Sequence, residues 1–89
     1  GKGSWFGAAG DSYRGEWVAG MRSGEGTYRW ASGSEYSGHW HEDRRHGQGT
    51  LIWSNGNRFE GEFVENRHWL GTYYTRNGGM HRCRAGKCR

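Results

Sequence analysis

The stretch YSGHWHEDRRHGQGTLIWSNG, residues 36–56, contains every part of the pattern that decides the fold. It opens with the phrase Tyr36-x-Gly38-x-Trp40, continues with Gly47-x-Gly49-Thr50 and ends in Asn55-Gly56. The opening phrase recurs at 13–17 and, with Phe in both aromatic positions, at 59–63, so the copies begin at positions 13, 36 and 59 with a constant interval. A short, fixed period of this kind is typical of stacked supersecondary units, and proteins built in this way bind partners more often than they catalyse reactions.

Each unit is predicted to be a β-hairpin. Alternate side chains of an extended strand share a face, so both rings of the phrase stand on one side with its glycine between them. The second strand of the quoted unit is residues 49–53. Turn signals follow at Ser32-Gly33, Asn55-Gly56 and Asn77-Gly78, and Asn55-Gly56 is the strongest because both residue types tolerate the type I′ conformation.

The register of these hairpins stays open at this point. A two-residue loop at Asn55-Gly56 places Ile52 on the face of Phe59, whereas a three-residue loop places Leu51 and Trp53 there. A slip of one residue reverses every side chain, so the sequence allows both arrangements.

The composition predicts an all-β fold with an aromatic core. The chain has 6 Trp, 5 Tyr and 3 Phe among its 89 residues, but only five Val, Leu or Ile residues. Its 18 glycines let rings lie against bare backbone, and it has no proline to interrupt a strand ladder. Because each hairpin can bury its rings only against its neighbours, we expect consecutive antiparallel β-hairpins in an elongated, twisted, open single sheet.

These phrases resemble the MORN (membrane occupation and recognition nexus) repeat, whose pattern is Tyr-x-Gly-x-Trp, a glycine and a Gly-x-Gly turn. The resemblance covers residues 1–79, as a partial unit at 1–10 and units near 13–33, 36–56 and 59–78. It implies a sheet of stacked hairpins that is used for contacts with proteins or lipids. Because the chain opens within a unit, we expect it to be a piece of a longer protein.

The copies depart from this pattern at three places. Asp43 and Asn66 stand where the first full copy has Gly20, although both residue types tolerate turn geometry. The third copy is one residue shorter, with Trp69-Leu70 in place of its first glycine. We therefore expect a distorted, capping unit at that end.

Positive charge is concentrated at the C-terminal end. Residues 1–75 hold 8 Lys or Arg and 9 Asp or Glu, whereas residues 76–89 hold five Lys or Arg and no acid. We expect residues 80–89 to be a basic, flexible tail outside the repeats. Nucleic-acid binding is disfavoured because the repeat body is slightly acidic. No apolar stretch reaches the roughly 20 residues of a membrane span, and an intracellular location is favoured over secretion.

The main functional hypothesis is a non-catalytic protein-interaction or scaffold module. Aromatic rings are rigid and make good anchors, so a partner protein or peptide segment is expected to bind along the aromatic face. Packing between repeats competes with this role, because nothing else in the chain can form a core. Open sheet edges also make self-association a candidate. The predicted partner-binding residues are Tyr13, Trp17, Tyr36, Trp40, Phe59 and Phe63.

The alternative is a module that reads a membrane surface or phosphoinositides through its basic tail. Each Lys or Arg held near an anionic membrane contributes about 1 kcal/mol. Residues 43–46, Asp-Arg-Arg-His, are placed in a turn between strands and could also contact phosphate. The predicted anionic-lipid-binding residues are Arg44, Arg45, Arg82, Arg84, Lys87 and Arg89.

No catalytic residues, cofactor or metal site are predicted. The glycine pairs lack the Gly-Lys-Ser/Thr ending of a phosphate loop. Cys83 and Cys88 allow a local disulfide, two free thiols or half of a metal site, and free thiols are favoured. A zinc site would use His81 with both cysteines, and His68 as a further ligand, but this spacing is not that of a standard zinc finger.

Overall fold

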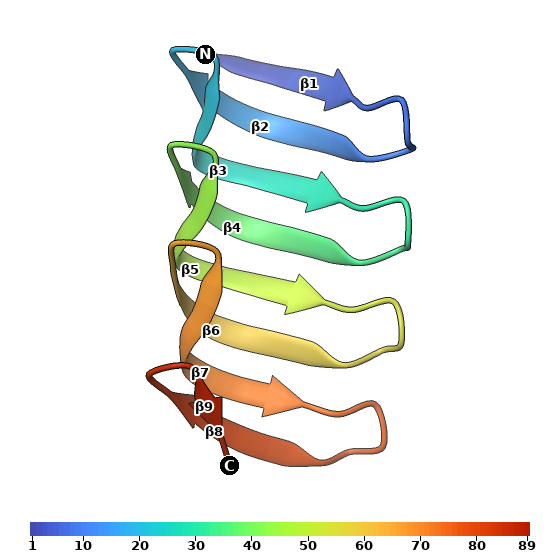
Figure 1. Cartoon of the computed structure of the whole chain (residues 1–89), viewed down its shortest axis with the longest axis vertical. Coiled ribbons are helices and arrows are strands. Elements are labelled where there is room, and N and C mark those ends of the chain that lie inside the picture. The colour runs from blue at the N-terminus through green and yellow to red at the C-terminus, as the bar shows by residue number, and fades with distance from the viewer.

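The computed structural model describes all residues from 1 to 89, and it consists of strands and turns without a helix. Nine antiparallel strands form one open sheet in which each strand pairs with its neighbours in chain order (Figure 1). This arrangement confirms the predicted fold class. The strands are β1 (Lys2–Phe6), β2 (Ser12–Val18), β3 (Met21–Arg29), β4 (Glu35–His41), β5 (Arg44–Ile52), β6 (Arg58–Val64), β7 (Arg67–Tyr74), β8 (Met80–Arg84) and β9 (Lys87–Cys88).

The sheet is elongated, with extents of 37 × 24 × 15 Å. Its long axis is the direction in which the strands stack, as Figure 1 shows. The structure offers no helix that is long and apolar enough to span a membrane.

Two kinds of connection alternate along the sheet. Five-residue loops join the strands at one end, on the right of Figure 1; they are residues 7–11, 30–34, 53–57 and 75–79. Two-residue turns join the strands at the other end, and both residues of each turn have the positive φ that a type I′ turn requires. These turns are Ala19-Gly20, Glu42-Asp43, Glu65-Asn66 and Ala85-Gly86.

The prediction of a type I′ turn at Asn55-Gly56 is wrong. Of these two residues only Gly56 has a positive φ, and the pair lies inside the loop 53–57. That loop is held by the N–H of Trp53, which donates to the carbonyl of Asn57 at 2.9 Å, and by the N–H of Gly56, which donates to the carbonyl of Trp53 at 2.9 Å. The five-residue loop settles the register, because it places Leu51 opposite Phe59.

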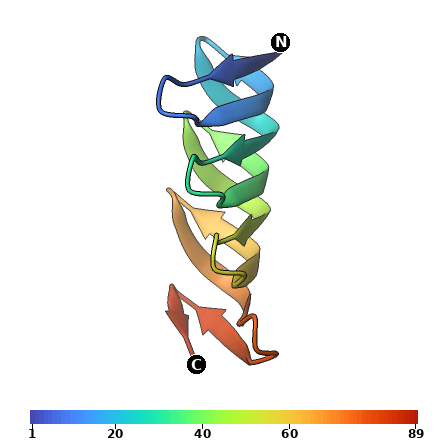
Figure 2. The same cartoon turned by 90° about the vertical axis from the view of Figure 1, so that its right-hand side faces the viewer.

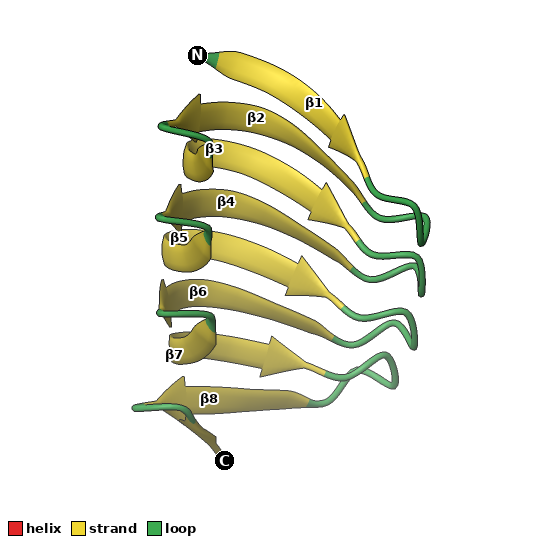
Figure 3. Ribbon diagram, turned by 45° about the horizontal axis from the view of Figure 1, so that its top comes forward, coloured by secondary structure: helices red, strands yellow, loops and turns green.

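A row of glycines crosses the sheet from β2 to β7, each glycine directly opposite the next. A Cβ atom added at Gly26 or Gly49 would overlap the ring of Tyr13 or Tyr36, so these rings need bare backbone beneath them. Beside the row, three of the strand pairs contain a β-bulge, a feature that bends a strand. Figures 2 and 3 show that the strands of the sheet are strongly curved. The row consists of Gly15, Gly26, Gly38, Gly49, Gly61 and Gly71.

The core lies on one side of this bent sheet, which we call the inner face. Arg22 and Tyr28 lie near opposite ends of β3, yet the guanidinium carbon of Arg22 is 5.0 Å from the centre of the Tyr28 ring. The aromatic face is therefore on the inside of the bend. Only eight residues are buried, all on this face: Tyr13, Tyr28, Tyr36, Trp40, Leu51, Phe59, Phe63 and Cys83.

The third copy is one residue shorter than the others, and the missing residue belongs to the β-bulge. In β2–β3 the single residue Glu16 faces three residues, Ser23 to Glu25, whereas in β6–β7 only Trp69 is unpaired. The flanking strand pairing is thus preserved, and Trp69 and Leu70 are left 40% and 48% exposed. This unit is distorted as expected, but it does not cap the sheet, because β7 also pairs with β8.

The C-terminal residues were expected to form a tail outside the sheet, and the structure instead places them in β8 and β9. The repeat pairing continues into β8, where Cys83 lies opposite Gly71 at the end of the glycine row. Tyr73 likewise lies opposite His81. The same backbone ladder that joins the repeats therefore also holds this segment.

Candidate interaction surfaces

The six predicted partner-binding rings meet in pairs across the glycine row of the inner face. Ring centres are 5.1 Å apart in Tyr13–Trp17 and Tyr36–Trp40 and 5.2 Å apart in Phe59–Phe63, and the ring planes are nearly perpendicular. Such edge-to-face pairs contribute about 0.5–1.5 kcal/mol beyond their buried area. Trp17 is half-buried, whereas the other five rings are at most 5% exposed. These five side chains form the core, and a partner cannot reach them in this structure.

Hydrogen bonds attach the paired rings to the backbone. The hydroxyl of Tyr36 donates to the carbonyl of His39 at 2.8 Å, and the indole N–H of Trp40 donates to the carbonyl of Gly26 at 3.1 Å. The first copy makes the same two kinds of bond. Burial raises the pKa of Tyr36 to about 12. The third copy has Phe at both positions and thus no polar ring atom to satisfy.

A second set of rings packs on this core and remains partly accessible. Trp30 and Trp53 occupy equivalent positions in successive repeats and line a hollow of about 240 Å³. Trp5 is 43% exposed and, together with Trp17, lines another hollow of about 320 Å³. We call Trp5, Trp17, Trp30 and Trp53 the aromatic rim.

Each hollow of the aromatic rim also contains an arginine. Arg22 lines the larger one and Arg45 the smaller one, and these two residues occupy equivalent positions in successive repeats. The guanidinium carbon of Arg22 lies 4.5 Å from the Trp40 ring centre, and that of Arg45 lies 5.6 Å from the Phe63 ring centre, so both make cation–π contacts. Burial lowers the pKa of Arg45 from its usual value. The accessible part of the inner face is therefore aromatic with an arginine in each hollow, and Asp43 pairs with the arginine of the larger one.

Both arginines bind the tight turn of the following repeat. Asp43 accepts hydrogen bonds from Arg22, and Asn66 accepts them from Arg45 in the same geometry. Asp43 and Asn66, which replace the glycine of the first copy, therefore join neighbouring repeats through their side chains. Sequence reasoning missed these contacts, although the spacing from arginine to turn residue is the same in both pairs and was a signal that could have found them.

The largest hollow, of about 870 Å³, lies on the opposite, outer face along the glycine row. It is lined by glycines and polar side chains, with no hydrophobic residue. Glu16 accepts the backbone N–H of Glu25 at 2.6 Å, and Nε2 of His39 lies 3.3 Å from a carboxylate oxygen of Glu25. Two of the carboxylates in this hollow are thus occupied by local contacts.

Four of the six predicted lipid-binding cations gather on one face of the β8–β9 hairpin. Arg84 lies opposite Lys87, and Arg82 and Arg89 exchange two backbone hydrogen bonds of 2.9 Å. Opposite residues share a face and so do alternate residues along a strand, so all four side chains point the same way. The exposed side chains of Met80 and Leu70 belong to this face as well. We call the four cations the basic face.

The other two predicted cations lie apart from the basic face. Arg44 and Arg45 belong to β5, which two strands separate from β8, rather than to the turn that was expected for them. Arg44 is exposed and lies 3.7 Å from a carboxylate oxygen of Glu65. Arg45 points into the inner face. The structure does not bring these six residues together into one site.

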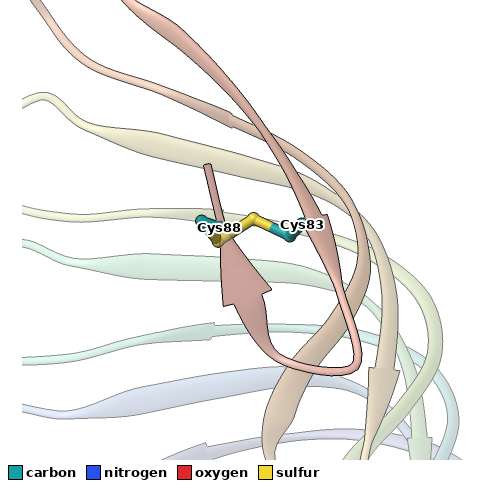
Figure 4. Close-up of a disulfide and its surroundings, with 2 residues drawn as sticks. All are labelled: Cys83 and Cys88. Atoms are coloured by element: carbon teal, nitrogen blue, oxygen red, sulfur yellow. A yellow bond between two sulfur atoms is a disulfide. The ribbon is translucent and has the colours of Figure 1, made fainter.

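The two cysteines form a disulfide, so the prediction of free thiols is wrong (Figure 4). Cys83 and Cys88 lie directly opposite each other across the Ala85-Gly86 turn, with Cα atoms 3.9 Å apart. This short distance follows from their position in the hairpin, which the sequence alone did not reveal. His68 lies beside them, whereas the ring of His81 packs near Tyr73 with centres 6.5 Å apart.

Repeated antiparallel hairpins in one open sheet define a solenoid-like β-repeat protein. The chain belongs to the MORN repeat family, whose profile matches three consecutive segments, residues 13–35, 36–58 and 59–80. Repeats of this family are non-catalytic modules that generally contact proteins or membranes. A comparison with curated proteins gave no match.

Proposed function

We propose that the chain is a non-catalytic interaction module that binds an extended segment of a partner protein along the aromatic rim. The observation that carries this proposal is that two accessible hollows in neighbouring repeats each combine two tryptophans with an arginine. The arginines occupy equivalent positions of the repeat, whereas the tryptophans of the two hollows come from different positions. Tryptophan and arginine are the residue types that most often dominate binding energy at protein interfaces.

The chemistry of the rim also suggests what it binds. Partly exposed indole rings favour apolar or aromatic side chains of the partner. The guanidinium group of Arg45, whose turn partner Asn66 carries no charge, favours carboxylates or backbone carbonyls, whereas the charge of Arg22 is already paired with Asp43. We therefore expect a segment that combines apolar and acidic residues. Five of the six rings predicted from the sequence support this surface from below. The sixth, Trp17, belongs to the rim, and the expected anchors are the four rim rings.

A displayed peptide library selected on the whole chain tests the proposal. The affinity of a selected peptide is then measured with Trp53→Ala and with Ile52→Ala, a matched control because Ile52 is the adjacent residue, is 42% exposed and points to the outer face. We expect a loss of at least about thirtyfold for Trp53→Ala, which is the size of an interface hot spot, and none for Ile52→Ala. Equal losses, or no selected peptide at all, contradict the proposal.

Binding to an anionic membrane surface is the second candidate, and the basic face favours it. Four exposed cations without an acidic partner lie beside the exposed apolar side chains of Leu70 and Met80. Cations near an anionic bilayer contribute about 1 kcal/mol each. The relevant ligand is the surface of the bilayer, with which all four side chains can be in contact at once.

Co-sedimentation with anionic and with neutral liposomes tests this second candidate. The first variant changes the four cations of the basic face to Gln, and the control changes Lys2, Arg14, Arg29 and Arg44 to Gln, which removes the same charge elsewhere. We expect binding to anionic liposomes to be lost only in the first variant. Equal loss in both variants would indicate an effect of net charge, and binding by neither wild type nor variants would reject the candidate.

A further inference from the structure

Three side chains with metal-binding atoms converge where the sheet ends. The ligand atoms of His68, Cys83 and Cys88 all lie within 4.8 Å of one another. They come from three strands, β7, β8 and β9, and the hairpin that carries both cysteines is tied to β7 by the N–H of Gly86, which donates to the carbonyl of Trp69 at 3.1 Å. Figure 4 shows the two sulfur atoms bonded to each other.

The repeat itself directs His68 toward these sulfurs. His68 occupies the position that Arg22 and Arg45 hold in the two preceding copies, and those two side chains enter the inner face. The His68 ring follows the same course, with its centre 5.1 Å from that of Phe59. Cys83 is 2% exposed on this face.

We propose that, when the disulfide is reduced, His68, Cys83 and Cys88 bind one Zn²⁺ ion with a fourth position open to water. Zinc takes nitrogen and thiolate ligands in a tetrahedron, at about 2.0–2.1 Å and 2.3 Å, which puts the ligand atoms about 3.5–3.8 Å apart. The His68 nitrogen lies within 4.8 Å of both sulfurs, about 1 Å more than this spacing at most. Coordination requires that the sulfur–sulfur bond is broken and that the two sulfurs then move apart.

The disulfide and the zinc-bound state exclude each other, because both use the sulfur atoms of Cys83 and Cys88. A dithiol reductant breaks the Cys83–Cys88 bond and becomes a cyclic disulfide, while its two protons and two electrons convert the bridge into two thiols. Zn²⁺ then replaces the two thiol protons, which pass to solvent, and His68 binds through a neutral ring nitrogen. The same end of the sheet is thus joined either by a covalent bond or by a metal ion.

His81 provides a matched control for this site. It lies two residues before Cys83 on the same face, but its ring is placed near Tyr73 and its nitrogens are not part of the cluster. A site defined only by the local sequence would use His81. The folded sheet selects His68, which belongs to β7 and reaches Cys83 through the pairing of β7 with β8.

Titration of the reduced chain of 89 residues with Co²⁺ as a spectroscopic probe tests the proposal, after the dithiol has been removed under inert gas. We expect one Co²⁺ per chain, with the intense visible bands of a tetrahedral site and sulfur-to-metal charge transfer, and displacement by Zn²⁺. His68→Ala and Cys88→Ser should each weaken binding at least about tenfold, and His81→Ala should leave it unchanged.

A second readout does not depend on the variants. Zn²⁺ should raise the Tm of the reduced wild-type chain, a chelator should reverse the effect, and the oxidised chain should not respond. The proposal is overturned if the reduced chain shows no tetrahedral bands and no rise in Tm. It is also overturned if His68→Ala binds as tightly as wild type, or if His81→Ala loses the site.

Discussion

Arg22 and Asp43 make four hydrogen bonds to each other although they belong to different repeats. The carboxylate oxygen Oδ1 of Asp43 accepts the backbone N–H of Arg22 at 2.7 Å and its Nε at 3.1 Å, while Nη2 donates to the Asp43 carbonyl at 3.1 Å. In return the N–H of Asp43 donates to the carbonyl of Arg22 at 3.0 Å. The same four bonds join Arg45 to Asn66, so this contact is the standard connection between repeats.

Replacing the side chain of Asp43 tests this connection. We expect Asp43→Ala to lower the free energy of unfolding by about 1–3 kcal/mol, because two donors of Arg22 lose their acceptor. Asp43→Asn should cost less than about 1 kcal/mol, since an amide oxygen accepts the same bonds and the lost ion pair is partly exposed. Urea denaturation measures both values. Equal costs for the two variants would show that the charge, and not the acceptor, holds the repeats together.

The contribution of Asp43 should also depend on pH. Its pKa is lowered first by the hydrogen bond from the backbone of Arg22, so the folded protein binds the proton less tightly than the unfolded chain. The stabilisation is therefore complete above the unfolded pKa, about 3.9, and disappears as the pH falls through the lower folded value. We expect the stability difference between wild type and Asp43→Asn to shrink as the pH falls below the unfolded pKa, and a constant difference would contradict this mechanism.

Glycines that lie beneath a ring should not tolerate substitution by a residue with a side chain. Gly49→Ala places a methyl group inside the Tyr36 ring, and we expect a loss of about 3 kcal/mol or more, at the upper end for overpacking. Gly78→Ala is the control, because nothing lies within 4 Å of its added Cβ and only its φ of 93° is unfavourable for alanine. That strain costs about 1–2 kcal/mol. Thermal denaturation compares them, and similar losses would refute the steric argument.

The disulfide should stabilise the end of the sheet rather than the whole of it. Cys88→Ser opens a bridge that spans only five positions, for which the chain-entropy relation gives about 2 kcal/mol. We expect the amide hydrogens of Arg82 and Arg89, which pair β8 with the last residue, to lose protection from exchange. Amides in β2 to β6 should keep theirs. Loss of protection throughout the sheet would contradict a local role.

Removing a core ring should lower the free energy of unfolding more than removing a ring of the aromatic rim. Tyr36→Ala removes a fully buried ring, and we expect it to cost about 3–5 kcal/mol. Trp53→Ala removes a partly exposed ring and should cost clearly less while leaving the fold intact, as circular dichroism can show. If Tyr36→Ala were well tolerated, the interpretation of the phrase as core would be wrong.

The repeated phrase was sufficient to predict the architecture, because a fixed period and alternating rings indicate stacked hairpins, and its resemblance to the MORN pattern predicted the family. Turn positions were harder. Asn55-Gly56 has the composition of a type I′ turn, yet the long loop is favoured because it buries Leu51 against Phe59. The real type I′ turns include Glu42-Asp43, which has no glycine, because contacts with the preceding repeat stabilise its positive φ angles.

The candidate site was less predictable than the fold, because the burial of each side chain depends on how the sheet bends. A linear pattern shows that Tyr36 and Trp40 share a face, but only the bend of the sheet decides that they are covered while Trp30 and Trp53 remain accessible. The roles of Arg22 and Arg45 depend on the same bend. His68 approaches the cysteines for a related reason, since strand pairing joins residues that are distant in the sequence.

The stacking of the repeats also fixes the distance between equivalent positions on the surface. Each unit adds two strands about 4.8 Å apart, so equivalent positions recur about every 10 Å along the long axis. An extended partner rises about 3.3 Å per residue, so one that lies along this axis passes from the place of Trp30 to that of Trp53 in about three residues. For the proposed function we therefore expect partners whose anchor residues are about three positions apart to bind best. Inserting one residue between two anchors should weaken binding, because the second anchor then no longer meets its ring.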